Sequence, residues 1–257
     1  MKHIVQFSGG KDSTCMLLMM LEREMPIDYI LYCDTTVEFP ETAVHIQKVN
    51  DYIKQYGKEV TILRAEHSYE WYFMDKPITR GKRAGAKGFG YPSTRNRWCT
   101  YRLKVKPFDD FVKKLGENYV VYLGIAADEG KRIKDDPHFR YPLYEWGVTE
   151  EDALKYCKEK GFTFEGIYDN FKRNGCYLCP LQSVDSWRTL YHKYPDLFQK
   201  ALDMEARNKE YQMPKYMRVE DYKAQFEFED KVGKVFKRYP RNKDKIKEFQ
   251  DKVMATL

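Results

Sequence analysis

The sequence predicts an α/β fold, a Rossmann-like parallel sheet followed by a helical C-terminal region. Short apolar runs rich in β-forming residues alternate with longer stretches of helical periodicity, which is the pattern of a parallel sheet. Polar clusters follow three of these runs, where the carboxyl ends of parallel strands meet. Beyond Ser183 the patterns are helical only, so we expect an α/β domain over residues 1–180 and a helical region over residues 181–257.

Local signals justify the individual elements. An apolar run predicts the first strand, and the periodic stretch that follows Ser13 predicts the first helix. Pro40 and Glu41 begin the second helix, because proline needs no N–H at the first helical position and a carboxylate favours the helix dipole. Thr149 caps a later helix and Gly161 ends it. The expected strands are 4–7, 27–33, 60–65 and 119–125, and the expected helices are 15–21, 40–56, 103–115 and 149–161.

The most informative segment joins the first strand to the first helix and reads Ser8-Gly9-Gly10-Lys11-Asp12-Ser13. Its two glycines let backbone N–H groups converge on an anion, and the helix N-terminus adds a partial positive charge. Lys11 adds a full charge. The spacing is neither that of the Gly-x-x-x-x-Gly-Lys-Ser/Thr loop nor that of the Gly-x-Gly-x-x-Gly motif. The turn therefore predicts a phosphate site of another kind.

This turn resembles the PP-loop of ATP pyrophosphatases. The resemblance implies that the turn holds the pyrophosphate part of ATP while a substrate oxygen attacks the α-phosphate, which releases pyrophosphate and leaves an adenylated intermediate. The alternative is a glycine-rich turn that only caps a helix. Six matching positions between a strand and a helix favour the functional interpretation.

Two further polar clusters follow predicted strands. Asp34 and Thr35 follow the second strand, and an acidic and basic segment follows the fourth, close after Gly124. One pocket at this edge of the sheet would collect both clusters and the turn. The adjacent carboxylates of Asp128 and Glu129 are also compatible with a purely structural role, in which they only cap a loop at the end of the strand. The candidate nucleotide-binding residues are Ser8, Gly9, Gly10, Lys11, Asp12, Ser13, Asp34, Thr35, Gly124, Asp128, Glu129 and Arg132.

Three of these candidates carry the expected chemistry. Lys11 and Arg132 would neutralise the charge that develops on the phosphates. Asp12 would help to hold the Mg²⁺ that accompanies ATP. We therefore expect ATP with Mg²⁺ as the ligand and these three residues as the catalytic set.

Composition limits the environment of the protein. No stretch approaches the roughly 20 apolar residues that cross a bilayer, and Met1-Lys2-His3 opens directly into a strand without a signal peptide. We therefore expect a cytoplasmic protein with no membrane partner. In that compartment, the six cysteines indicate free thiols, metal ligands or redox chemistry rather than a disulfide scaffold.

The positive charge of the chain is local. Net charge is +6, but residues 76–108 hold ten Lys or Arg and no Asp or Glu, so the rest of the chain carries −4. Tyr91, Trp98 and Tyr101 interleave with these cations. Such a segment suits a polyphosphate or a nucleic-acid backbone, with aromatic rings available to stack on bases. Lys76 to Lys106 is therefore a candidate nucleic-acid interface, and the alternative is a solvated loop with incidental charge.

Four cysteines are candidate metal ligands. Cys176 and Cys179 form a Cys-x-x-Cys knuckle, a spacing that places two thiolates about one metal. Cys99 and Cys157 are the candidates for the remaining two ligands, and ordinary free thiols are the alternative for all four. Four thiolates suit Zn²⁺ or a 4Fe–4S cluster equally, whereas three with an open position favour iron–sulfur chemistry.

Taken together, these motifs resemble the phosphoadenosine phosphosulfate reductase family, and more narrowly its ATP-using members. The resemblance implies an adenine nucleotide alpha hydrolase-like fold, ATP or a sulfonucleotide in the pocket, and often an iron–sulfur cluster on cysteines that match Cys99, Cys176 and Cys179. It extends from residue 4 to about residue 200. The residues that carry it are Ser8 to Ser13, Asp34-Thr35, Phe39 to Thr42, Trp98 to Thr100, Leu103-Lys104, Pro107, Asp128-Glu129, Arg132, Gly175-Cys176 and Cys179-Pro180.

The chain departs from the sulfonucleotide reductases of this family in its cysteines and in its phosphate loop. Thiol-dependent sulfonucleotide reductases use a cysteine near a flexible C-terminus, whereas this chain has no cysteine after Cys179. Those reductases also tend to carry a degraded phosphate loop, whereas Lys11, Asp12 and Ser13 are present here. We therefore expect an ATP pyrophosphatase that adenylates an acceptor, in the manner of the tRNA thiolation enzymes and DNA phosphorothioation proteins, with sulfur from a partner protein or a cluster.

Two alternatives remain open at this point. One is a sulfonucleotide reductase that takes its thiol from a partner protein. The other belongs to a different class, a nucleic-acid-binding regulatory protein that uses the nucleotide as a switch. The sequence does not identify the acceptor.

Overall fold

The computed structural model describes residues 1–207 and 218–256, and they form two compact units. The first unit combines Met1–Tyr69 with Trp98–Cys176, and the second combines Glu70–Arg97 with Tyr177–Leu257. The boundary after Cys176 lies close to the expected boundary at residue 180. The sequence does not indicate that residues 70–97 belong with the C-terminal helices.

Contacts inside the second unit explain why residues 70–97 belong to it. The Tyr91 hydroxyl donates to the carbonyl of Ala201 at 3.4 Å, and Arg207 pairs with Glu70 at 3.3 Å. Tyr91 is buried, so its ring is part of the apolar interior of this unit. The helices of the second unit are α3 (Tyr69–Met74, which starts in the first unit), α9 (Val184–Lys193), α10 (Pro195–Arg207), α11 (Val219–Val232) and α12 (Lys243–Met254).

The first unit is built on a five-stranded, fully parallel sheet with the order β3-β2-β1-β4-β5, so the predicted α/β fold is confirmed. The sequence misses the edge strand β5, because two residues are too short to show a period. The strands are β1 (Lys2–Gln6), β2 (Tyr29–Asp34), β3 (Val60–Arg64), β4 (Tyr119–Leu123) and β5 (Phe139–Arg140).

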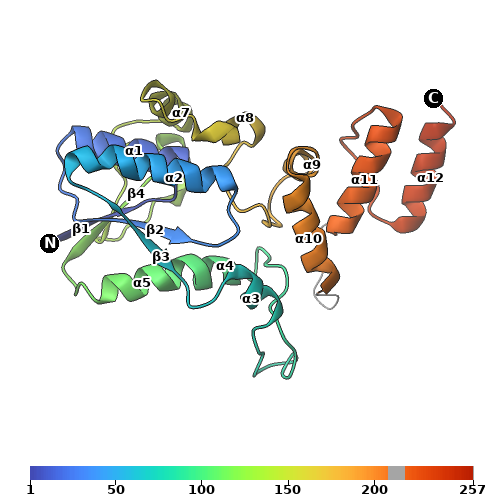
Figure 1. The fold of residues 1–257 in the computed structure, drawn as a ribbon, viewed down its shortest axis with the longest axis horizontal. Helices are drawn as coiled ribbons and strands as arrows, with labels where there is room; N and C mark the ends of the chain where they lie inside the picture. Colours follow the sequence, from blue (N-terminus) through green and yellow to red (C-terminus); the bar gives the residue numbers. More distant parts are fainter. Residues whose placement is uncertain (208–217, 257) are drawn as a thin grey trace. The chain divides into compact units, whose positions relative to one another are not determined.

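Helices cover both faces of this sheet, with α1 and α2 on one face and α5 on the other (Figure 1). The helix expected at residues 103–115 starts earlier, as a short α-helical turn and a π-helical turn that lead into α5. In the described ranges, none of the helices combines the length and the apolar character needed to cross a bilayer. The helices of the first unit are α1 (Lys11–Glu22), α2 (Pro40–Ile53), α4 (Trp98–Thr100), α5 (Lys106–Lys113), α6 (Pro142–Glu145), α7 (Glu150–Glu159) and α8 (Ile167–Asn170).

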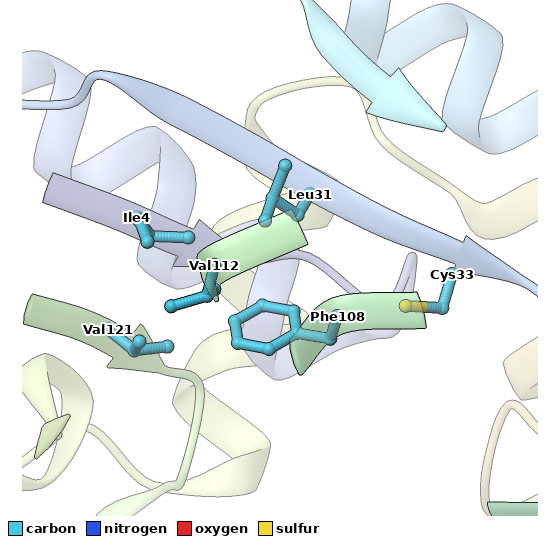
Figure 2. Packing of buried hydrophobic residues seen from close by; sticks show 6 residues of the cluster. All are labelled: Ile4, Leu31, Cys33, Phe108, Val112 and Val121. Carbon is cyan, nitrogen blue, oxygen red and sulfur yellow. The ribbon is translucent and has the colours of Figure 1, made fainter. Parts of the chain in front are cut away.

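Alternation along the strands builds the core under α5. Figure 2 shows Phe108 and Val112 of α5 packed with Ile4, Leu31 and Val121, which come from three adjacent strands. Since side chains alternate across a strand, Val5 points to the opposite face, which α1 covers, and it is also fully buried. Both faces of the central strand are therefore buried, as in doubly wound sheets.

The strand order places a topological switch point between β1 and β4. The chain proceeds outward from β1 to β2 and β3, and then returns to pair β4 on the other side of β1. Ligands of open parallel sheets bind outside the carboxyl ends of the strands at such a point. The glycine turn follows β1, and Gly124 follows β4 directly. A Cβ on Gly124 would lie 2.8 Å from the backbone N and Cα of Ser13, so the end of β4 touches the first turn of α1.

A second close contact joins α1 to α2. His45 of α2 is buried, and its Nε2 lies 3.0 Å from Thr14 Oγ1 of α1. Its ring packs against Phe164 in a tilted arrangement, with 4.3 Å between ring centroids. Burial lowers the pKa of His45 to about 4. The neutral imidazole is therefore a structural part of the layer behind the glycine turn.

The substitution Gly124→Ala tests the contact between β4 and α1. We expect it to lower the free energy of unfolding by about 1–3 kcal/mol, because the added methyl group meets backbone rather than a flexible side chain. Urea denaturation measures the effect. Gly175→Ala is the matched control, since a Cβ there meets no atom within 4 Å. Equal stability of the two variants would contradict the described contact.

The substitution His45→Gln tests the buried imidazole. The unfolded chain takes up a proton near pH 6.5 but the folded protein only near pH 4, so His45 makes the protein less stable as pH falls through this window. Between pH 7.5 and pH 5, we expect the wild type to lose about 2 kcal/mol more stability than His45→Gln. Urea denaturation at the two pH values measures the difference. Parallel losses would show that His45 is protonated in the folded state.

Candidate functional site

The glycine turn has the geometry of an anion cradle. Gly9 adopts φ +72°, a conformation that favours glycine, and Gly10 in extended geometry caps α1. The Ser13 hydroxyl donates to the Gly10 carbonyl at 3.1 Å and lies 2.9 Å from the Ser8 hydroxyl. The serines therefore close the turn on itself, and the first N–H groups of α1, which have no partner within a helix, lie at its mouth.

Lys11 is held by two carboxylates. Its ammonium lies 3.0 Å from Asp12 and 2.5 Å from Glu150 at the start of α7, and only 10% of its side chain is exposed. Burial alone lowers the pKa of Lys11, but the hydrogen bond to Glu150 and the charge of Asp12 raise it above its usual value. Burial raises the pKa of Asp12, against the opposing effect of Lys11. The ammonium is thus held inside the protein, and both carboxylates are more exposed than it is, Asp12 at 22% and Glu150 at 41%.

The acidic and basic segment after β4 lies at the same end of the sheet. An Asp128 carboxylate oxygen accepts the backbone N–H of Glu150 at 3.2 Å, so this segment caps α7. Arg132 makes two hydrogen bonds of 2.7 Å to Glu129, and its side chain is 60% exposed. The charge of Glu129 also acts on Asp12. Contacts through Glu150 therefore connect this segment to the glycine turn.

The residues after β2 are engaged in other contacts. Asp34 pairs with Arg64 of β3 at 3.0 Å and accepts the N–H of Thr36 at 2.8 Å. Thr35 is buried, and its hydroxyl lies 3.5 Å from the sulfur of Cys176. Thr35 therefore lies beside Cys176, whereas Asp34 is engaged in its own ion pair.

Sequence reasoning misses three residues that contact the turn. The Tyr168 hydroxyl accepts the backbone N–H of Lys11 at 2.8 Å. The Asn174 amide donates to the Gly9 carbonyl at 3.2 Å and accepts from the Thr42 hydroxyl at 3.0 Å. Glu150 is the third. No local motif marks these residues, because each lies more than 120 positions from its partner in the turn or in α2.

A polar cluster surrounds two of the candidate metal ligands. Lys104 lies 3.7 Å from Glu38, and the charges of Cys176 and Cys99 act on its ammonium. Burial by itself lowers the pKa of Lys104, but these neighbours raise it overall. Burial raises the pKa of Glu38 to about 7. Glu38 also forms an isolated β-bridge with Cys176, so backbone pairing holds the cluster together.

Cys157 is not in this cluster, and its proposed role as a metal ligand is not supported. It is fully buried in α7 and its thiol donates to the Lys11 carbonyl at 3.5 Å. The neighbouring Cys15 and burial raise its pKa, which keeps it protonated. Cys179 belongs to the second unit, where its carbonyl accepts the N–H of Gln182. Among the described residues, no group of three or more His, Cys, Asp or Glu is arranged to hold a metal ion, so we derive no step through a cysteine-bound metal.

The basic segment divides between the two units. Residues 76–97 belong to the second unit and residues 98–106 to the first. In the second unit, a bridge between Pro77 and Lys87 forms a narrow hairpin, and Arg83 stabilises it by donating to the carbonyls of Gly88 and Phe89. Arg83 is therefore structural, whereas other cations of this hairpin are exposed, namely Arg80, Lys82 and Lys87.

Relatives of this chain occur in an archaeon and a bacteriophage. Two uncharacterized proteins of Methanocaldococcus jannaschii, MJ0066 and MJ0973, are 26% and 24% identical to it over 210 and 209 residues. Each match covers 77% of this chain, but only 40% and 46% of the respective relatives. The uncharacterized nin region protein ORF290 of Escherichia phage lambda is 28% identical over 183 residues, which are 64% of this chain and 62% of the phage protein. The chain thus spans less than two thirds of these relatives.

A match to a protein-family model identifies the family of this chain. The sequence model of the phosphoadenosine phosphosulfate reductase domain matches residues 2–182. This range contains all five strands of the sheet, the glycine turn and the Cys-x-x-Cys knuckle. Because it is more than half of the 257 residues, the chain belongs to the phosphoadenosine phosphosulfate reductase domain family.

Proposed function

We propose that this protein is an ATP pyrophosphatase that adenylates an acceptor for sulfur transfer. The observation that carries the proposal is the Ser8–Ser13 turn, which is closed by its own serines at the switch point of the sheet. Family membership indicates a nucleotide-utilising, sulfur-related enzyme. The intact Lys11, Asp12 and Ser13 favour ATP over a sulfonucleotide as the nucleotide.

In this proposal the N-terminus of α1 holds the pyrophosphate part of ATP. Lys11, Asp12 and Glu150 together carry a charge of −1, which suits the Mg²⁺ that ATP brings. Asp12 is assigned to this ion because it lies in the first turn of α1, directly after the glycine turn that holds the phosphates. Arg132 reaches the phosphates by exchanging Glu129 for a phosphate oxygen, a change that its exposed side chain permits.

The chemistry follows from charge placement. The acceptor oxygen attacks the α-phosphorus, the bond to the β-phosphate oxygen breaks, and pyrophosphate leaves with its charge balanced by Mg²⁺ and Arg132. The adenylated acceptor then carries AMP as a leaving group for sulfur. The ammonium of Lys104 interacts with Cys99 and Cys176, and a nearby cation favours the thiolate form of a cysteine, which supports the handling of sulfur near β2. A partner protein supplies the sulfur.

The substitution Asp12→Asn tests the adenylation chemistry. We expect release of pyrophosphate from ATP to fall at least about 100-fold, because the amide cannot neutralise Mg²⁺. A phosphate assay coupled to inorganic pyrophosphatase measures the rate, with candidate acceptors supplied as total nucleic acid. Asp51→Asn on α2 is the control, because Asp51 is exposed and pairs with Lys54. Turnover in Asp12→Asn at the rate of the control would refute the proposed role of the turn.

We also propose that the acceptor is a nucleic acid bound by the exposed hairpin cations. Replacing Arg80, Lys82 and Lys87 with Gln should lower the slope of log affinity against log salt concentration by up to about 3, since each lost phosphate contact removes roughly one released counterion. Filter binding of single-stranded DNA and of RNA at several salt concentrations measures the slope. The control replaces Lys245 and Lys247, two exposed lysines of α12. An unchanged slope in the triple variant would exclude this surface.

A further inference from the structure

We infer that Tyr168 is a phosphate-binding residue of the glycine turn, and that its hydroxyl donates a hydrogen bond to an oxygen of the bound pyrophosphate group. This inference rests on the proposed function, because it takes the turn to be the site of the ATP phosphates. It adds a residue that lies outside every motif of the sequence. Tyr168 belongs to α8, which follows α7 in the chain.

The position of the hydroxyl carries the inference. Its oxygen lies 2.8 Å from the backbone nitrogen of Lys11, the first N–H of α1. A Cβ on Gly10 would lie 3.4 Å from the same oxygen, an ordinary contact distance, so the hydroxyl also lies next to the residue that caps α1. The first N–H groups of a helix are the donors that bind anions. The hydroxyl of Tyr168 therefore stands beside the remaining donors of this turn, at Asp12 and Ser13.

The hydroxyl of Tyr168 can donate a hydrogen bond to a ligand. Its oxygen accepts the N–H of Lys11, and the backbone N–H of Asn174 also acts on it. Both described interactions use the oxygen as acceptor, so among the described residues its proton has no acceptor. Burial raises the pKa of Tyr168, which keeps this proton in place, and the two N–H donors only partly offset that effect. Accepting two hydrogen bonds polarises a hydroxyl and makes it a stronger donor.

The surroundings hold the phenol ring in one position. Phe164 packs edge-on against the Tyr168 ring, with 4.9 Å between centroids, and its ring also contacts the buried His45 in a tilted arrangement. Phe164, Glu165 and Gly166 all have φ values between +52° and +81°, a left-handed run that includes two non-glycine residues. Such strain persists only where neighbouring contacts enforce it.

An ion pair and a side-chain bridge supply those contacts. Lys48 of α2 pairs with Glu165 at 2.6 Å, which ties the left-handed run to the helix behind the turn. The Asn174 side chain links the Gly9 carbonyl to Thr42. Both tether the segment that carries Tyr168 to α2 and to the turn. The hydroxyl is therefore preorganised, as a residue that binds a charged group in a defined place must be.

Removal of the hydroxyl gives a diagnostic change in affinity. Tyr168→Phe takes away one donor to the phosphate but frees the N–H of Lys11. If the hydroxyl binds phosphate, affinity falls, because a hydrogen bond to a charged group is lost. If the hydroxyl only accepts the hydrogen bond of the Lys11 N–H while no ligand is bound, the affinity for phosphate stays equal or rises.

Calorimetric titration of the full chain with inorganic pyrophosphate, with MgATP and with adenosine tests the inference. We expect Tyr168→Phe to bind pyrophosphate and MgATP about tenfold more weakly than the wild type, with little change for adenosine. Tyr156→Phe is the matched control, since it removes a hydroxyl that donates to Glu22 at 2.7 Å in the same unit. It should bind all three ligands like the wild type.

The outcomes separate this inference from the proposed function. Equal or tighter binding of pyrophosphate by Tyr168→Phe overturns the inference and leaves the proposed function intact. Failure of the wild type to bind pyrophosphate and MgATP overturns both. If Tyr168→Phe does not fold, the wild type labelled with ¹³C at the tyrosine Cζ atoms provides the test. Pyrophosphate should then shift one signal, which a sample labelled at position 168 alone assigns to Tyr168, and an unshifted Tyr168 signal refutes the inference.

Discussion

The close approach of β4 to the first turn of α1 is the constraint on which the site depends. Gly124 has no side chain, so the end of β4 can lie against the backbone of Asp12 and Ser13. This contact brings the segment after β4 next to the glycine turn, and through that segment it positions the start of α7. The carboxylate of Glu150 then reaches Lys11. A larger residue at position 124 would separate all of these groups at once.

The ammonium of Lys11 is already paired with carboxylates before any ligand binds. A lysine that the sequence presents as a free cation for phosphates is largely enclosed by Asp12 and Glu150. Enclosed ion pairs gain little net stability, because desolvation offsets much of their attraction. The arrangement instead fixes the orientation of Asp12 and leaves one negative charge in excess, so a divalent cation is better accommodated there than a bare phosphate. The groups left to bind phosphate oxygens are the backbone N–H donors at the start of α1, the hydroxyl of Tyr168 and the guanidinium of Arg132.

Local signals were enough to predict part of the molecule. Alternating apolar runs and a strand-turn-helix motif predicted the parallel sheet, α1, α2 and α7, and the turn itself, because these depend on neighbours in the chain. Glu150, Tyr168 and Asn174 were not predicted, since their partners lie more than 120 residues away. The spacing of the cysteines suggested one shared site, but it carries no information on Cys157, whose place in α7 turns it toward Lys11 and Cys15. The edge strand β5 is too short for any pattern.

The path of the chain between the two units has a consequence for biosynthesis. Residues 70–97 leave the first unit and pack with helices made much later, as the contact between Tyr91 and Ala201, 110 residues apart, shows. A ribosome therefore releases this segment, with its aromatic rings and its seven Lys and Arg residues, long before the helices that it packs against are synthesised. Truncation of the chain before α10 therefore leaves residues 70–97 without the helix that they contact.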